Sequence, residues 1–366
     1  MKTFAVPLFL SLTAGAMAAQ PAPVVSPEVN AAERTVVFRL RAAKAADVRV
    51  RTQWNKQTSP MQKGADGLWS LTAAEVPPGV WEYNFVLDGL NVLDPANPAI
   101  KPQRNPNTSI LHLPGTPPNP WDYQEVPHGA VHQHDFMGRA AGRVRSVWVY
   151  TPPGYEREPA RRYPLLVLQH GSGDNHKTWV EHGKAHWILD NLIAGGRARP
   201  MIVMMLDGHP LGQVSREAGD RRAASLTAFR RELLEEALPL VEAHYRVSAQ
   251  REQRAITGLS MGGWQSLSVG LNALDRFAWI GSFSGAVDEK EVAASLADAA
   301  GTNARVKLLW IACGKDDFLL ERNRQLVAAL AGSGVKHDWR LTEGDHSWPV
   351  WRGYLADFVP LLFAEP

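Results

Sequence analysis

The fold is decided by residues 255–265, which read Ala-Ile-Thr-Gly-Leu-Ser-Met-Gly-Gly-Trp-Gln. Within them Gly258, Ser260 and Gly262 form the pattern G-x-S-x-G, which is typical of a sharp turn between a strand and a helix. Small residues are needed at such a turn because strand and helix nearly touch. The residues before the turn are strand-like, and residues 261–271 can form a helix, although glycines weaken that signal. The sequence therefore predicts that Ser260 is a nucleophile. The alternative is a glycine-rich turn whose serine has no catalytic role.

In the C-terminal two thirds of the chain, apolar strand-like runs alternate with helical patterns. Residues 165–168 and 200–206 are unbroken apolar runs, as is usual for buried parallel strands. Residues 225–245 have the pattern of one long amphipathic helix, with Pro239 as a candidate kink. Such alternation is typical of a parallel sheet between helices. We therefore expect an α/β domain with a mostly parallel sheet over residues 125–366.

The N-terminal third has a different pattern, with short alternating runs separated by turn signals. Trp81, Tyr83 and Phe85 occupy alternate positions of one run, so they would share one face of a strand. That spacing suits the core of a sandwich, although an aromatic row could instead bind sugar. We therefore predict a small all-β sandwich over residues 25–115. Residues 94–120 are rich in Pro and Asn and predict a linker or wrapping segment without regular structure.

Residues 1–18 have the features of a secretory signal. Lys2 supplies a positive charge, residues 4–12 are apolar, and the segment ends in Ala-Met-Ala, which suits a signal peptidase. The apolar stretch is too short to span a bilayer comfortably. We therefore expect cleavage after Ala18 and a secreted or periplasmic protein.

Composition limits the partners. The 366 residues carry a formal net charge of +2 without a long run of one sign, which argues against nucleic acid and against an anionic membrane. Beyond the signal no stretch approaches transmembrane length. Cys313 is the only cysteine, so an intramolecular disulfide is impossible. The oligomeric state stays open.

Two pairs of histidines have a spacing that metal ligands use. His182 and His186 would lie one helical turn apart, and His132 and His134 could share one face of a strand. No further ligand motif accompanies either pair, so we expect polar surface positions rather than a metal site. No organic cofactor is implied.

A nucleophilic serine needs a base, and the base needs an orienting acid. In α/β-hydrolases the acid and then the histidine follow the serine along the chain. Downstream of Ser260, histidine occurs only at His337 and His346. His337 lies in a predicted strand, whereas His346 lies in a polar turn before the last helix, where a base can reach the strand ends. The position therefore favours His346.

The acid should also follow a strand. The Gly-Lys-Asp-Asp sequence that follows the apolar run 308–313 offers Asp316 and Asp317, and both remain candidates. The oxyanion formed during attack needs fixed N–H donors. Met261 supplies one at the start of its helix, and we expect Ser172, in a His-Gly-Ser-Gly loop, to supply the second.

These motifs resemble those of carbohydrate esterase family 1, the group of esterase D and the feruloyl esterases. The likeness covers residues 125–366 and is carried by Gly-Leu-Ser-Met-Gly-Gly at 258–263, Ser-Phe-Ser-Gly at 282–285 and His-Ser-Trp at 346–348. It implies an α/β-hydrolase fold and a Ser-His-Asp triad. The family pattern Gly-x-x-Asp places the acid at the second aspartate, Asp317.

The N-terminal sandwich resembles the immunoglobulin-like domain, related to glycogen-binding modules, that precedes some of these esterases. Residues 77–83 and the Asp-Gly turn at 88–89 carry that likeness. Enterochelin esterases share the two-part layout, so layout does not choose between the groups. We expect the sandwich to support the hydrolase region or frame its cleft rather than bind sugar by itself.

The combined interpretation is an exported serine carboxylic-ester hydrolase that works through an acyl-enzyme. The resemblance implies feruloyl or acetyl esters of plant polysaccharide as substrates. Trp264, Trp348 and Trp351 lie near the catalytic positions in the sequence and could line a substrate pocket or pack between helices. The alternatives are a siderophore-ester hydrolase, an acyltransferase and a carbohydrate-binding protein whose hydrolase region is inactive.

Overall fold

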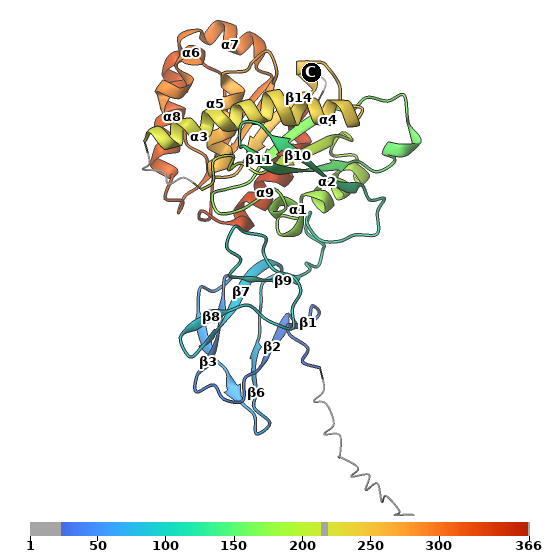
Figure 1. The fold of residues 1–366 in the computed structure, drawn as a ribbon, viewed down its shortest axis with the longest axis vertical. Helices are drawn as coiled ribbons and strands as arrows, with labels where there is room; N and C mark the ends of the chain where they lie inside the picture. The colour runs from blue at the N-terminus through green and yellow to red at the C-terminus, as the bar shows by residue number, and fades with distance from the viewer. Residues whose placement is uncertain (1–22, 214–218, 365–366) are drawn as a thin grey trace, which may run out of the picture.

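The computed structural model describes residues 23–213 and 219–364. The expected signal at residues 1–18 lies outside these ranges. Figure 1 shows a β-rich N-terminal region beside a larger region in which helices lie on both faces of a sheet. Among the described helices, none combines the length and the apolar character needed to cross a membrane.

The larger region is built on a sheet that has eight strands over the described residues, in the order β10-β11-β13-β12-β14-β15-β16-β17. Strand β10 pairs antiparallel with β11, and β11 with β13, while the remaining neighbours are parallel. This confirms the predicted mostly parallel sheet of an α/β-hydrolase. The strands are β10 (Ala130–Gly138), β11 (Arg143–Thr151), β12 (Leu165–Gln169), β13 (Ile202–Leu206), β14 (Arg254–Gly258), β15 (Trp279–Phe283), β16 (Leu308–Gly314) and β17 (Asp338–Thr342).

Helices pack on both faces of this sheet, and an apolar core lies under each layer. One layer contains α1 (Thr178–Glu181), α2 (Ala185–Ala194) and α9 (Trp348–Phe358). The other contains α3 (Asp220–Arg231), α4 (Leu238–His244), α5 (Met261–Leu271), α6 (Ala293–Ala297), α7 (Ala299–Arg305) and α8 (Leu320–Ser333). Strands β12, β13 and β14 are buried along their whole length, which explains the unbroken apolar runs at residues 165–168 of β12 and in β13.

The long helix predicted over residues 225–245 differs in detail. The structure has α3 and α4 joined by a wide π-helical turn, Glu232–Ala237, and Pro239 lies in the first turn of α4. Proline has no N–H to donate, so it is tolerated at that position, and the wider turn precedes it. The same turn buries Glu232, whose carboxylate accepts a hydrogen bond from Arg145 Nε at 2.7 Å. A buried ion pair thus fixes this segment to β11.

The N-terminal region is all-β, as predicted, and over the described residues it consists of two antiparallel sheets. One sheet contains β1 (Glu28–Asn30), β2 (Thr35–Arg41), β6 (Leu68–Ala73) and β5 (Gln62–Lys63). The other contains β4 (Thr58–Pro60), β3 (Val48–Thr52), β7 (Gly79–Leu87), β8 (Leu90–Val92) and β9 (Ser109–Leu113). Tyr83 and Phe85 are buried between the sheets, whereas Trp81 is only half-buried. The aromatic row is therefore mostly core.

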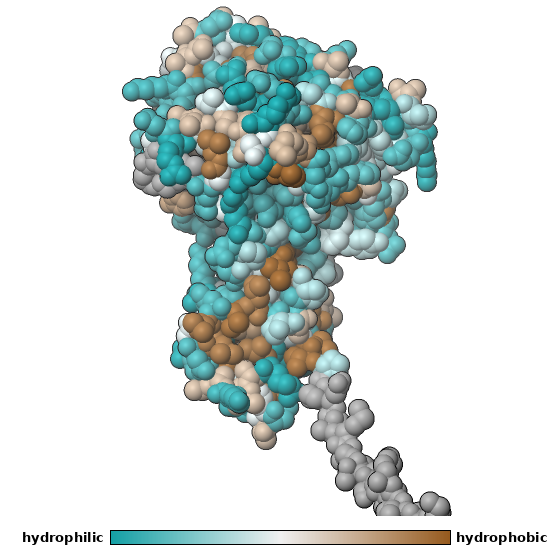
Figure 2. Space-filling view, viewed as in Figure 1, coloured by the Kyte–Doolittle hydropathy of each residue, from teal (hydrophilic) through white to brown (hydrophobic). Residues whose placement is uncertain are grey.

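The apolar surface of the molecule is unevenly distributed. Figure 2 shows larger apolar areas on the N-terminal sheets than on the face of the helical region in the same view. Leu90 and Val92 of β8 are among the exposed side chains, at 70% and 39% of full exposure. Both lie on a short strand at the end of its sheet.

The Pro- and Asn-rich segment at residues 94–120 is not free of regular structure, contrary to the prediction. It contains β9, which pairs with β7 from Tyr83↔Ser109 to Gly79↔Leu113. The apolar Ile110, Leu111 and Leu113 supply the burial that overrides the turn-forming composition around them. The segment therefore completes the second N-terminal sheet before the chain enters the hydrolase region.

Helix α5 and strand β15 approach so closely that only glycine fits between them. A Cβ atom at Gly263 would lie 2.9 Å from the Cα atom of Gly285 and 2.8 Å from the Oγ atom of Ser282. A Cβ atom at Gly285 would lie 2.4 Å from the carbonyl carbon of Gly263. This contact explains why Ser-Phe-Ser-Gly at residues 282–285 accompanies the serine turn.

We predict that Gly263→Ala destabilises the protein by about 1–3 kcal/mol, because backbone on the facing segment cannot move aside as a flexible side chain would. Gly332→Ala in α8 is the matched control, since its new Cβ would meet nothing within 4 Å. That control should leave stability unchanged or raise it by up to about 1 kcal/mol. Urea denaturation of both variants gives the comparison, and equal midpoints would contradict the close-contact explanation.

Candidate active site

Ser260 occupies a strained turn between β14 and α5. Its backbone angles are φ 51° and ψ −113°, a conformation that L-residues rarely adopt. Cβ atoms at Gly258 and Gly262 would each lie 2.6 Å from the carbonyl oxygen of Gln169 at the end of β12. The G-x-S-x-G pattern therefore exists because the turn is pressed against the neighbouring strand.

A continuous chain of hydrogen bonds joins Ser260 to a buried carboxylate. His346 Nε2 lies 2.8 Å from Ser260 Oγ, and His346 Nδ1 lies 2.9 Å from both carboxylate oxygens of Asp317. With the proton on Nδ1, the imidazole donates to Asp317, and Nε2 accepts the serine hydroxyl proton. The three side chains come from different places in the sequence: the turn after β14, the loop after β16 and the turn before α9.

The surroundings keep Asp317 ionised and hold His346 in place. Burial alone would raise the pKa of Asp317, but hydrogen bonding to His346 and Ser284 outweighs it and lowers the pKa. The backbone N–H of Leu319 also donates to the carboxylate at 2.8 Å. The His346 ring packs against Phe318, with centroids 4.4 Å apart, and edge-to-face against Trp351 at 4.8 Å. A negative charge therefore faces the imidazole at neutral pH.

The other candidates for base and acid lie away from Ser260. Asp316 is exposed, and its backbone N–H donates to the carbonyl of Gly344 at 3.0 Å. His337 precedes β17, and its Nδ1 lies 2.9 Å from the carbonyl oxygen of Val335. Of the two aspartates left open by the residue pattern, the structure brings Asp317 to the histidine.

The predicted oxyanion donors belong to segments that meet at the serine. Met261 follows Ser260 directly and begins α5, so its N–H is at a helix N-terminus. Ser172 belongs to the segment of residues 170–174, here termed the Gly171 loop. A Cβ atom at Gly171 would lie 2.5 Å from Leu259 Cδ1, so this loop touches the serine turn.

His170 shapes the Gly171 loop. Its Nδ1 lies 2.8 Å from the carbonyl oxygen of Gly171, and its Nε2 accepts the N–H of Gly208 at 2.9 Å. His170 therefore joins the Gly171 loop to the segment that follows β13, which is a structural role.

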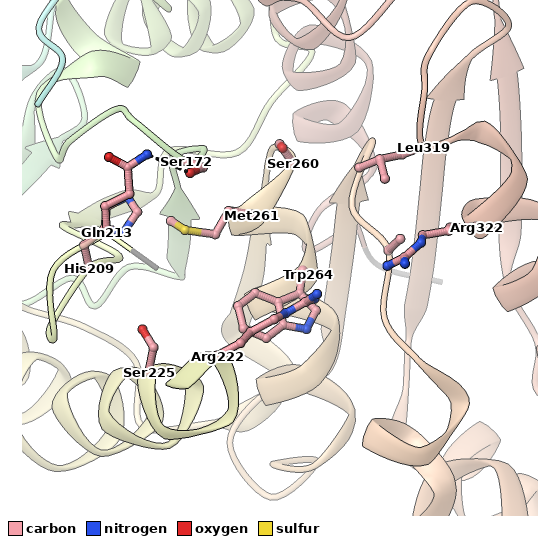
Figure 3. Close-up of a pocket in the computed structure, with 11 residues that line it drawn as sticks. Ser172, His209, Gln213, Arg222, Ser225, Ser260, Met261, Trp264, Leu319 and Arg322 are labelled. Atoms are coloured by element: carbon pink, nitrogen blue, oxygen red, sulfur yellow. Dashed lines mark hydrogen bonds between the residues drawn. The ribbon is translucent and has the colours of Figure 1, made fainter. Parts of the chain in front are cut away.

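Ser260 lines two cavities. The larger, about 390 Å³, is formed by the hydrolase region alone. Figure 3 shows Ser172, Gln213 and His209 on one side of it and Leu319 and Arg322 on the other, with residues of α5 between them. The smaller, about 220 Å³, also touches His346 and is bounded partly by N-terminal residues, namely Gln53, Glu82, Lys101 and Gln103. Ser260 is thus open to one space formed by the hydrolase region and to another shared with the N-terminal region.

The three predicted substrate tryptophans are largely buried but line these cavities. Trp264 lines the larger one, where the Arg222 guanidinium lies 4.1 Å from its ring centroid. Trp348 and Trp351 line the smaller one. Trp351 Nε1 donates to Ser284 Oγ at 3.1 Å, and Trp348 packs edge-to-face on Trp179. Each ring therefore combines packing with a wall of the site.

Several residues at the cavities were not identified from the sequence. Arg222, Gln213 and Arg322 come from segments without a local motif, and so do the N-terminal residues Gln53, Lys101 and Gln103. No spacing rule connects residues 53–103 to residue 260. Contacts between the N-terminal and hydrolase regions bring them together, among them the pairing of residues 103–104 with the Gly171 loop and the ion pair of Lys56 with Asp345.

The two histidine pairs are not parts of a ligand cluster in the described ranges, where no group of three or more His, Cys, Asp or Glu side chains is arranged to hold a metal ion. His182 is fully buried rather than at the polar surface, and burial lowers its pKa to about 3. His134 Nε2 lies 2.6 Å from Tyr245 Oη, and His132 Nε2 lies 3.2 Å from Thr151 Oγ1.

The fold and the serine turn define an α/β-hydrolase, and comparison with known proteins specifies the family. Residues 138–362 match the esterase family described as "Putative esterase", so the chain belongs to that family. A curated relative, the endo-1,4-beta-xylanase/feruloyl esterase of Xylanibacter ruminicola, is 29% identical over 83% of this chain and 41% of its own length. The chain therefore spans less than half of that relative.

Solved structures give the same fold. A ferulic acid esterase superposes with a TM-score of 0.56 at 26% identity, covering 64% of this chain and 97% of that protein. The enterochelin esterase of Shigella flexneri has a TM-score of 0.63 at 20% identity and covers 89% of this chain and 91% of that protein. At that identity the second comparison supports the fold alone.

Proposed function

We propose that this protein hydrolyses carboxylic esters through an acyl-enzyme on Ser260, with His346 as base and Asp317 as orienting acid. The observation that carries the proposal is the hydrogen-bonded chain from Ser260 Oγ through His346 to Asp317 at a strained turn. A serine that only fills a turn has no need of a histidine at 2.8 Å backed by a buried carboxylate.

The reaction proceeds in two halves. Ser260 Oγ attacks the ester carbonyl carbon while its proton passes to His346 Nε2, and the N–H groups of Met261 and Ser172 stabilise the oxyanion. The intermediate collapses, the bond to the alcohol breaks, and Nε2 returns the proton to the leaving oxygen. Water then attacks the acyl-enzyme with the same base, which releases the acid and restores the serine. Asp317 stabilises the imidazolium in both halves without taking a proton.

For the substrate we propose a feruloyl or acetyl ester of plant polysaccharide. Relatives named as feruloyl or ferulic acid esterases support this choice at 26–29% identity. The larger cavity could hold an aryl acyl group beside Trp264, and the smaller one, partly bounded by the N-terminal region, could hold the alcohol.

The same proposal includes export and a two-domain organisation. Residues 1–18 would be a signal removed after Ala18, residues 25–115 an immunoglobulin-like domain and residues 125–366 the esterase domain. The strand bounds support this division, since β9 ends at Leu113 and β10 begins at Ala130.

A siderophore-ester hydrolase is the second candidate. A curated relative favours it: the iron(III) enterobactin esterase of Escherichia coli is 24% identical over 72% of this chain. The higher identity of the feruloyl and ferulic acid esterases favours the first candidate.

Ser260→Ala should leave the fold intact, because the hydroxyl contributes little to the core. Activity on p-nitrophenyl acetate should fall by about 10⁴–10⁶-fold, since the nucleophile is lost. Steady-state kinetics together with a thermal unfolding curve makes the measurement. Retention of more than about a tenth of the activity would refute the nucleophile.

Asp317→Asn and Asp316→Asn form a matched pair on one loop. The first should lower kcat by about 10⁴-fold with little loss of stability, because His346 loses the partner that fixes its tautomer. The second should retain most of the activity, because Asp316 is exposed and does not contact the histidine. Reversal of the two results in kcat measurements would move the acid to Asp316.

A panel of three esters separates the substrate classes. We expect methyl ferulate and acetylated xylan to be cleaved with higher kcat/KM than a catecholate siderophore. Product release is followed by chromatography, with Ser260→Ala as the blank. Preference for the siderophore by tenfold or more would replace the polysaccharide ester by the second candidate.

A further inference from the structure

Residues 99–104, here termed the strap, run from the N-terminal sheet to the Gly171 loop. At the sheet end, the N–H of Ile110 donates to the carbonyl of Ala99 and the N–H of Lys101 to that of Thr108, at 2.7 and 3.1 Å. The strap is thereby fixed to the segment that leads into β9.

At the other end the strap pairs with the Gly171 loop itself. Gln103 forms an antiparallel bridge with Asp174, and the N–H of Arg104 donates to the carbonyl of Gly173 at 2.8 Å. Thr178 Oγ1, at the start of α1, donates to the carbonyl of Pro102 at 2.6 Å. The Gly171 loop is therefore held by the backbone of a segment that precedes it by about 70 residues in the chain.

A line of buried charges reinforces this pairing. Lys101 Nζ lies 3.0 Å from Glu82 Oε1 on β7 and 3.7 Å from Asp174 Oδ1 in the Gly171 loop. The three side chains are only 8–14% exposed. Thr108 Oγ1 donates to the second oxygen of Glu82 at 2.8 Å. One ammonium group thus links the N-terminal sheet to the loop that carries Ser172.

His182 also contacts Glu82, with 3.4 Å between its Nε2 and Oε1 of the carboxylate. Burial lowers the pKa of His182 to about 3, so the ring is neutral at ordinary pH. Because the His182 ring is uncharged, the cation that pairs with Glu82 is Lys101. Loss of the lysine charge would leave two carboxylates close together in a buried site, a costly arrangement.

We propose that the strap positions the Gly171 loop for catalysis, with Lys101 as a positioning residue that acts through Asp174 on the N–H of Ser172. This inference rests on the proposed function, because it assigns the oxyanion role to Ser172. The N-terminal region then contributes to the rate of hydrolysis by holding this loop, in addition to any contact with the substrate. A loop displaced by about 1 Å can cost up to about 100-fold in rate.

The test is a kinetic comparison of the full-length wild type with its Lys101→Met variant, with p-nitrophenyl acetate as the substrate. We expect kcat to fall by about tenfold to 100-fold with KM changed by less than about twofold, because the oxyanion forms only after binding. The Ki of a trifluoromethyl ketone, which forms a tetrahedral adduct, should rise in parallel with the loss of kcat/KM. Lys101→Arg should restore most of the rate. A merely structural defect would not move kcat and Ki together.

Asp174→Asn is a second variant that tests the proposal if Lys101→Met fails to fold. Asparagine has the same shape as aspartate, and the substitution leaves Lys101 paired with Glu82. It should lower kcat in the same way, and the double variant should be no worse than the poorer single one, because both act through one contact. Lys63→Met is the control: its Nζ donates to the carbonyl of Ala45 within the N-terminal region, and its kcat should be unchanged.

Amide hydrogen exchange over residues 170–178 separates this proposal from the proposed function. Faster exchange there in Lys101→Met supports the strap without any assay of activity, whereas a wild type that cleaves no ester refutes the function alone. Unchanged exchange overturns the strap. So does an unchanged kcat, or a loss that lies in KM while the Ki of the ketone stays constant.

Discussion

The close contact between the turn at Ser260 and the end of β12 is the constraint on which the rest of the site depends. With the Gln169 carbonyl 2.6 Å from the places where Cβ atoms of Gly258 and Gly262 would lie, only glycine permits the turn. The turn then places Ser260 at the carboxyl ends of the parallel strands, where the loops after β12 and β16 also emerge. A binding site at that edge follows from the topology.

Signals confined to a few residues predicted most of the fold. Apolar runs identified β12 and β13 because strands buried on both faces have no polar side to show. Chain order and loop position selected His346, which the structure places at the serine. Asp316 and Asp317 could not be separated by residue type, because one step along a loop reverses which side chain points inward. The hydrogen bond from the Asp316 N–H to the carbonyl of Gly344 determines which of the two side chains points inward, and the sequence does not show that hydrogen bond.

Features that depend on distant pairing could not be predicted. The Pro-rich composition of residues 94–120 concealed β9, and it could not separate a linker from a wrapping segment such as the strap. Lys101 and Gln103 have no motif, and their place beside Ser260 follows only from pairing with the Gly171 loop. The burial of a side chain also depends on tertiary contacts, which the sequence does not show. Trp348 packs against Trp179 from a helix far away in the sequence, so spacing alone could not separate packing from substrate binding.

The buried charges between the two regions favour one arrangement more than they add stability. Taking Glu82, Lys101 and Asp174 out of water costs several kcal/mol per ion, which their mutual attraction offsets only when the geometry is good. A displaced N-terminal region would carry Lys101 away together with Glu82 and leave Asp174 without its cation. The penalty for misplacement is therefore large even where the net gain is small. Since Asp174 belongs to the loop that carries Ser172, the arrangement favoured by these charges is also the one that orders the site beside Ser260.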